Sequence, residues 1–114
     1  MRVQIENLAQ QALIDIYYYN YQYSLKNAVE TNKNIRHLIH DLQNSPYIGR
    51  YIPEISDEHF REIIYRKAKH SIYRIMYYIS EKNNTIYVFS IINTRQNFKH
   101  ILKLHNYFNN YFKF

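Results

Sequence analysis

The sequence predicts an α+β fold in which a helical hairpin covers one face of a mostly antiparallel sheet of about four strands. Three observations support this class. Apolar residues recur every three or four positions between residues 8 and 42, alternate between residues 60 and 93, and recur with helical spacing after Thr94. An apolar hairpin must bury its face against the sheet, which defines two layers. The 114 residues form one predicted domain, 1–114.

The first predicted elements are a short strand and two helices. Residues 2–5 alternate, as in a strand, and Asn7 is the expected N-cap of the helix that follows. The expected buried stripe of this helix is Leu8, Ala12, Ile16, Tyr19 and Tyr23, widened by Leu13. A short link at residues 23–24 leads to a second helix, which ends before the turn at residues 44–46. Its expected stripe is Leu25, Ala28, Val29, Asn32, Ile35, Ile39 and Leu42.

Three predicted strands follow an irregular stretch. Residues 46–57 contain both prolines and the only glycine, so we expect no regular element there. Residues 60–65, 71–79 and 86–93 predict strands, joined by a basic loop at residues 66–70 and a hairpin loop at residues 81–84. The last strand is the most apolar, so we expect it to be central and covered on both faces. A C-terminal helix and an aromatic extension, residues 103–114, complete the prediction.

Composition excludes several classes of site. The chain has no cysteine, which excludes disulfides, a thiolate nucleophile and cysteine-ligated metals. A single glycine excludes a glycine-rich phosphate loop. His37 and His40 share one helix face, with Asp41 next to them, and could bind zinc, but the sequence shows no further ligand that would complete such a site. No apolar stretch is long enough to span a membrane. We therefore expect a cytoplasmic protein with no cofactor, no metal and no membrane partner.

The net charge of +6 is concentrated in the second half of the chain. Residues 1–60 carry a net charge of −2, whereas residues 61–114 carry +8 and only two carboxylates. This excess favours an acidic protein or a polyanion as partner over a role in solubility alone. The candidate partner-binding residues are Arg61, Arg66, Lys67, Lys69, Arg74, Asn93 and Arg95.

Four motifs resemble a known superfamily when they are taken in order. They are Ala12-Leu13-x-Asp15-Ile16, Leu42-x-x-x-Pro46-x-x-Gly49-Arg50-x-x-Pro53-Glu54, Arg61-Glu62 with Tyr73-Arg74-Ile75-x-Tyr77, and Ile91-Ile92-Asn93-Thr94-Arg95. Over about residues 1–102 the chain resembles the RelE/ParE toxins of bacterial type II toxin–antitoxin modules. The resemblance implies a growth-arresting toxin that a cognate antitoxin neutralises with an amphipathic segment. It also implies one of two targets: ParE-like members poison DNA gyrase, and RelE-like members cut mRNA, mostly on the ribosome.

A metal-independent ribonuclease would need a base, cations for the phosphate and an acid. Arg74 lies in the middle of a predicted strand and Arg95 follows the strand that pairs with it, so both could bind the phosphate with a guanidinium fork. The resemblance to YoeB-like enzymes implies that Glu54 is the base. Arg61 is a further cation, and His70 or His100 could supply the acid. Structural roles are the alternatives: Arg74 could pair with Glu62 across strands, Glu54 could cap a loop, and Arg95 could begin a helix.

Departures from the ribonuclease pattern favour the gyrase target. The strand Arg61-Glu62-Ile63-Ile64 lacks the lysines that RelE-like ribonucleases carry there, and no His-Tyr pair follows the last strand. ParE-like members use the same scaffold without an acid–base set, although they usually show histidine where this chain has Asn93. We therefore expect an inhibitor of DNA gyrase. The first alternative is a ribosome-dependent mRNA endoribonuclease, and the second is a non-toxic basic module that binds nucleic acid.

Overall fold

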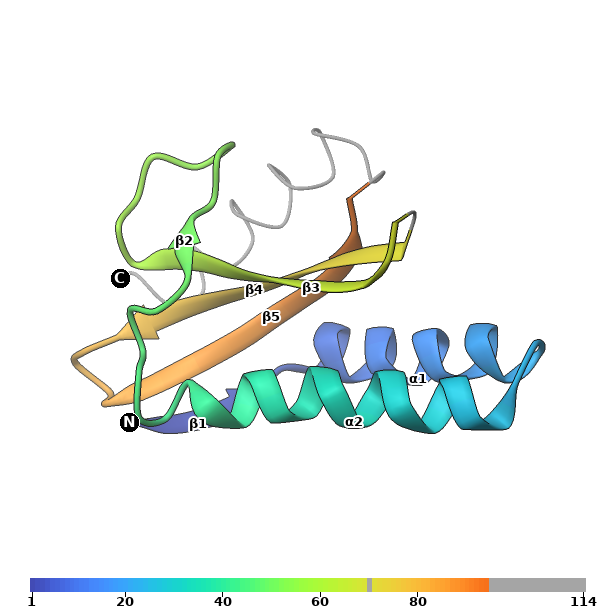
Figure 1. Cartoon of the computed structure of the whole chain (residues 1–114). Helices are drawn as coiled ribbons and strands as arrows, with labels where there is room; N and C mark the ends of the chain where they lie inside the picture. Colours follow the sequence, from blue (N-terminus) through green and yellow to red (C-terminus); the bar gives the residue numbers. More distant parts are fainter. Residues whose placement is uncertain (70, 95–114) are drawn as a thin grey trace.

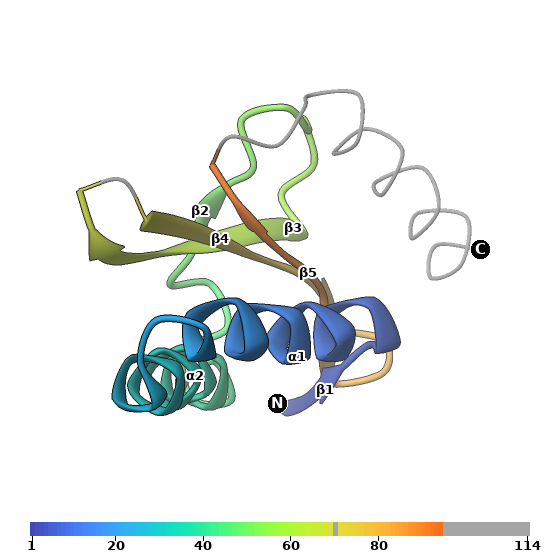
Figure 2. The ribbon, with the colours of Figure 1, turned by 90° about the vertical axis from the view of Figure 1, so that its right-hand side faces the viewer.

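The computed structural model describes residues 1–69 and 71–94, in which two helices lie on one face of a five-stranded sheet (Figure 1). The elements in chain order are β1 (Arg2–Ile5), α1 (Asn7–Tyr21), α2 (Leu25–Asp41), β2 (Arg50–Tyr51), β3 (Phe60–Ala68), β4 (Ser71–Ser80) and β5 (Thr85–Asn93). Figure 2 shows both helices on the same side of the sheet. The predicted α+β class is confirmed; the predicted C-terminal helix and residues 103–114 lie outside the described residues.

The strands are arranged in the order β1-β5-β4-β3-β2. β1 runs parallel to β5, and the other neighbouring strands pair antiparallel. β5 therefore lies between β1 and β4, and residues 85–92 are all buried, as expected for the most apolar strand. The fifth strand is β2, which the sequence prediction missed because two residues are too short to show alternation.

A β-bulge in β5 determines which of its side chains face the helices. Met76 pairs with Ser90 and Tyr77 pairs with Val88, so β5 contains one extra residue, Phe89. The extra residue shifts the alternation: Ile86, Val88 and Ile91 join the core on the helical face, whereas Tyr87, Phe89 and Ile92 join a second cluster on the opposite face. Both faces of the strand are thereby covered.

The buried stripe predicted for α1 was wrong in part. Leu13 is fully buried as expected, but Ala9 and Asn20 are buried while Leu8 and Tyr19 are exposed. The helix is apolar or aromatic on most sides, so spacing alone did not identify the face that meets the sheet. The N-cap position is occupied by Glu6, with no side-chain cap, and Asn7 is the first helical residue. Tyr23 lies beyond the helix, in the link to α2.

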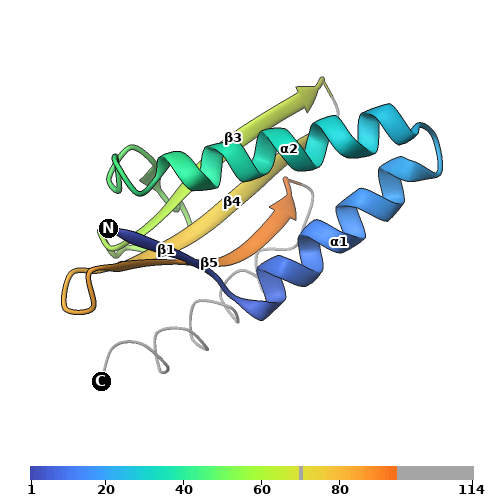
Figure 3. The same cartoon turned by 90° about the horizontal axis from the view of Figure 1, so that it is seen from below.

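The second helix begins at a capped end and follows its prediction more closely. The Ser24 hydroxyl accepts a hydrogen bond from the Asn27 amide at 3.1 Å, which satisfies one of the free N–H groups of the first turn. Ala28, Ile35, Ile39 and Leu42 are buried as predicted. Leu25 and Val29 are exposed instead, and Thr31 is buried. Seen from below (Figure 3), the turn between α1 and α2 extends past the strands, so residues near it have less sheet to cover.

The main core lies between the helices and the sheet. Leu13, Ile35 and Ile39 pack in one cluster with Ile75 and Val88, as the sequence predicted. Ile16 packs against the same cluster from its edge. The opposite face of the sheet has its own cluster, to which the stretch between β2 and β3 contributes Ile52 and Ile55. This stretch also carries Glu54 onto that face.

Candidate functional site

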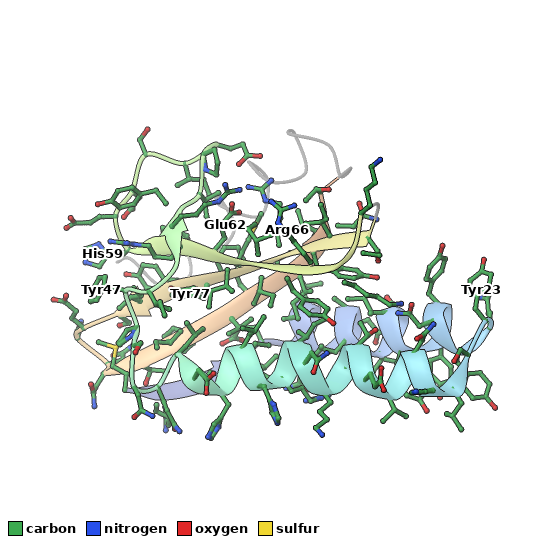
Figure 4. All side chains as sticks on the ribbon, in the orientation of Figure 1. Tyr23, Tyr47, His59, Glu62, Arg66 and Tyr77 are labelled. Atoms are coloured by element: carbon green, nitrogen blue, oxygen red, sulfur yellow. The ribbon has the colours of Figure 1, made fainter. Side chains whose placement is uncertain are left out.

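Four charged side chains meet on the sheet face that points away from the helices. Arg74 lies in the middle of β4, Glu62 lies on β3, Arg50 lies on β2, and Glu54 follows β2 in the irregular stretch. Alternation places Glu62 and Arg74 on the same face, because Glu62 pairs with Met76, two residues from Arg74. Figure 4 shows Glu62 on the side of the sheet opposite to the helices. We call these four residues the charge cluster.

Arg74 is the centre of the charge cluster and binds both carboxylates. Its Nη1 and Nη2 atoms donate to the two Glu54 carboxylate oxygens at 2.8 and 2.7 Å, a bidentate arrangement. Its Nε atom donates to Glu62 Oε1 at 2.7 Å. The Arg74 side chain is only 9% exposed, and the Glu62 side chain is completely buried. All three nitrogens of the guanidinium therefore bind carboxylates of this chain.

Arg50 completes the cluster from the edge of the sheet. Its Nε and Nη2 atoms lie 2.6 Å from Glu62 Oε2, so each Glu62 oxygen contacts one arginine. More than half of the Arg50 side chain is exposed. Two arginines and two glutamates form a neutral network, which satisfies the buried charges of Glu62 and Arg74.

The hydrogen bonds from Arg74 hold the pKa of the Glu54 carboxyl below its ordinary value of 4.5. Burial opposes this effect but does not reverse it. The same pair raises the pKa of Arg74, with Glu54 as the largest cause and burial as the opposing one. Both side chains are therefore charged at neutral pH.

We expect this pair to make folding stability depend on pH in the acid range. A carboxyl whose pKa is lower in the folded chain stabilises the fold above its unfolded pKa, and this contribution is lost as the pH falls through the folded pKa. Between pH 5 and pH 3, urea unfolding should show a larger loss of stability for the parent chain than for Glu54→Gln. Equal losses in the two proteins would contradict the pairing.

A tyrosine anchors the segment that leads into β2 and Arg50. The Tyr77 hydroxyl donates to the Pro46 carbonyl at 2.8 Å and accepts from the Gly49 amide at 3.0 Å. Burial raises the pKa of Tyr77. A Cβ atom at Gly49 would lie 2.4 Å from the Tyr77 hydroxyl and 2.7 Å from the Glu62 carbonyl oxygen. Glycine is needed here because the backbone approaches Tyr77 and β3 so closely.

Arg61 lies outside the charge cluster, on the opposite face of β3. Its guanidinium carbon lies 4.3 Å from the ring centre of Tyr51 and 5.2 Å from that of Tyr47. Its Nε and Nη1 atoms donate to the Glu58 and Gly49 carbonyls at 2.8 and 3.1 Å. Figure 4 shows Tyr47 and Tyr77 on the helical side of the sheet, near the end where β2 lies.

The remaining candidate residues lie near the turn between β3 and β4 and at the end of β5. Arg66 and Lys69 are exposed, and Arg66 points away from the helices (Figure 4). Lys67 instead donates to the Asn20 side chain of α1. Asn93, the last residue of β5, is exposed and pairs with Tyr73. Arg95, His70 and His100 lie outside the described residues.

His37 and His40 are exposed on α2, and His40 contacts Gln43 through its ring Nε2 atom at 3.0 Å. Within residues 1–69 and 71–94, no group of three His, Cys, Asp or Glu side chains is arranged to hold a metal ion. No helix in the same residues is long and apolar enough to cross a membrane.

From the sequence, Glu62 was an alternative partner of Arg74, and Glu54 was grouped with Arg74 only as a ribonuclease candidate, so their ion pair was not predicted. Arg50 and Tyr77 were missed as partners. Both appear in the motifs quoted above, Arg50 after Gly49 and Tyr77 three residues after Arg74. Both therefore belong to the spaced motifs, but their contacts depend on the pairing of β2 with β3. A strand of two residues is too short to be recognised from the sequence.

The fold, the motif positions and a match over residues 3–98 define the class of this protein. That stretch matches the family described as "ParE toxin of type II toxin-antitoxin system, parDE". The chain therefore belongs to the ParE toxin family, within the RelE/ParE superfamily. No curated protein matches its sequence.

Solved structures show the same fold at low sequence identity. A chain of the chromosomal ParDE system from P. aeruginosa has a TM-score of 0.62 at 16% identity, covering 82% of this chain and 95% of that one. A chain of the intact E. coli RelBE toxin–antitoxin complex has a TM-score of 0.60 at 12% identity, covering 83% and 98%. The isolated E. coli RelE toxin has a TM-score of 0.58 at 12% identity, covering 93% and 97%.

Proposed function

We propose that this chain arrests growth as a ParE-like inhibitor of DNA gyrase that acts by binding, and that a cognate antitoxin neutralises it. Membership of the ParE toxin family supports a toxin–antitoxin role. The choice of gyrase over mRNA as the target rests on the charge cluster, in which Arg74 is bound to Glu54 and Glu62. It leaves Glu54 and Arg74 poorly suited to the ribonuclease roles that the superfamily resemblance suggested for them.

A general base must reach a proton and should have a pKa near the working pH. Both carboxylate oxygens of Glu54 accept hydrogen bonds from Arg74, and its pKa is lowered. A phosphate-binding arginine must present its planar fork to the substrate. The fork of Arg74 is bound to Glu54, and its Nε is bound to Glu62. This arrangement supports a structural role for the cluster and inhibition through protein contact.

The antitoxin is the second part of the proposal. No carboxylate occurs between Glu62 and Glu81, whereas Arg66, Lys67 and Lys69 fall in this interval. An acidic, amphipathic antitoxin segment would complement the charge of this region. We place the antitoxin surface around Arg66 and Lys69, with Asn93 and Arg95 as further candidate contacts.

The variant Glu54→Gln separates the two toxin mechanisms. Glutamine keeps the shape of the side chain but accepts protons poorly, and general-base catalysis contributes about 10²–10⁴-fold. We expect the variant to arrest growth as the parent does, and we expect both purified proteins to inhibit supercoiling by gyrase. DNA, RNA and protein synthesis would be followed separately after a short pulse of expression, with thermal unfolding as the control for folding.

Three results would contradict the proposal in different ways. Loss of toxicity in a folded Glu54→Gln protein, with mRNA cut by the parent, would identify a ribonuclease. Rapid arrest of translation with intact DNA would point to the same conclusion. An absence of growth arrest by the parent chain would favour a binding module without toxicity.

A further inference from the structure

The segment from Tyr47 to Tyr51, here called the edge loop, leads into and includes β2, an edge strand of the sheet, and exposes three large apolar side chains. Ile48 is 71% exposed, Tyr51 58% and Tyr47 42%. Ile48 is the most exposed large aliphatic residue among the described residues. Exposed apolar groups gathered in one short segment mark contact sites more often than single exposed residues do.

The edge loop is held in place at both ends although it is irregular in its first half. Pro46 and Gly49 are bound to the Tyr77 hydroxyl, and the Tyr47 hydroxyl donates to the Glu81 carboxylate on the β4–β5 turn. Arg61 donates to the Gly49 carbonyl at 3.1 Å. The Ile48 amide donates to the Ser45 carbonyl at 3.2 Å. These bonds fix the backbone on both sides of Ile48.

A fixed loop loses little conformational entropy when a partner binds it, and this favours affinity. The composition of the edge loop is also that of a contact surface, because tyrosine and arginine are enriched among the residues that dominate binding energy. Arg61 stacks between the two tyrosines and supports their exposed rings. The hydrogen bonds on both sides of the exposed Ile48 fix its backbone, so this surface needs little rearrangement to bind a partner.

The charges around the edge loop indicate which kind of partner fits. Arg50 is paired with Glu62, the Tyr47 hydroxyl is bonded to Glu81, and the charge of Arg61 acts on Tyr47 together with the opposite charges of Glu58 and Glu81, so no excess of positive charge attracts a polyanion. The basic segment between residues 63 and 80 is the region suited to an acidic antitoxin. More than half of the Arg50 side chain is exposed, two residues along the chain from Ile48, so it can donate to a further acceptor.

We propose that the edge loop binds the target protein, with Ile48 in an apolar pocket and the exposed side of Arg50 against a carboxylate or carbonyl at the rim of that pocket. This inference rests on the proposed function, since it assigns a surface to the inhibitor of gyrase. It divides the molecule into two contact regions, one for the target and one for the antitoxin.

The test compares Ile48→Asp and Ile48→Ala with the matched control Leu25→Asp, which changes another exposed apolar residue at the start of α2. Purified proteins would be assayed for inhibition of supercoiling by gyrase, and cells for growth arrest and for rescue by the cognate antitoxin. We expect Ile48→Asp to lose about 30-fold or more in inhibition, as for a dominant contact residue. Ile48→Ala should lose less, and Leu25→Asp should match the parent. Thermal unfolding should be unchanged in all three.

Each other outcome overturns the inference or the proposed function separately. If the parent inhibits gyrase and the folded Ile48→Asp variant does so equally, the edge loop is not the target surface. If Ile48→Asp remains toxic but escapes the antitoxin, the loop belongs to the antitoxin surface. If the parent leaves gyrase unaffected, the proposed function fails. Growth arrest by Ile48→Asp then decides whether the loop binds another target: lost arrest supports that role, and retained arrest overturns it.

Discussion

Replacing Glu62 with alanine is expected to lower the free energy of unfolding by about 3–5 kcal/mol, because it removes one partner from a buried ion pair. The Glu62 side chain has no exposed surface and contacts Arg74 and Arg50 through its two oxygens. Without it, two guanidinium groups remain near each other, and only Arg74 keeps a carboxylate, that of Glu54. Such a loss is a large part of the stability of a domain this size. Urea unfolding at neutral pH measures it.

The matched control is Glu58→Ala, which removes an exposed carboxylate near the start of β3. A surface change of this kind should alter stability by less than about 0.5 kcal/mol. Glu62→Gln should fall between the two alanine variants, because an amide keeps one acceptor but loses the charge. A Glu62→Ala protein within about 1 kcal/mol of the parent would mean that the charge cluster contributes little to folding.

Replacing Ile39 with alanine is expected to destabilise the protein by about 2–5 kcal/mol, the range for truncating a buried aliphatic side chain. Ile39 is 2% exposed and packs in the cluster between the helices and the sheet. Alanine favours the helix, so the loss measures packing and not helix formation. Val29→Ala in the same helix is the control, since Val29 is about half exposed and should cost far less. Similar losses in both variants would show that the buried face of α2 has been assigned wrongly.

The strands other than β2 were predictable because their alternation is long and their turns carry clear signals, although β3 continues to Ala68, into the stretch predicted as a basic loop at residues 66–70. Residues 2–5 matched β1 in full, and the residue 81–84 turn lies where Asn83 and Asn84 indicated it. Asn84 has a φ of 49°, a conformation that asparagine tolerates better than most residues. The bulge at Phe89 left no trace in the sequence, because the residues around it are apolar on both faces.

The helices and the charge cluster were less predictable for two physical reasons. Tyrosine suits both the core edge and the surface, so a helix rich in tyrosine has no single stripe. The cluster joins residues 12 and 20 positions apart in sequence, and their contact depends on the register of β2, β3 and β4. Arg74 was correctly given Glu62 as an alternative partner, because neighbouring strands place such residues together. That Glu54 binds the same guanidinium could not be read from spacing alone.

The parallel pairing of β1 with β5 sets the time at which the newly made chain can finish folding. Arg2 pairs with Thr85, and Ile5 pairs with Val88. At about 5–20 residues per second, a ribosome takes roughly 4–17 seconds to add the residues that separate these partners. During that interval β1 has no strand to pair with, and the helical hairpin lacks the core residues that β5 supplies to the sheet face it covers. Although β1 is synthesised before the other described elements, it is thus among the last of them to reach its final contacts.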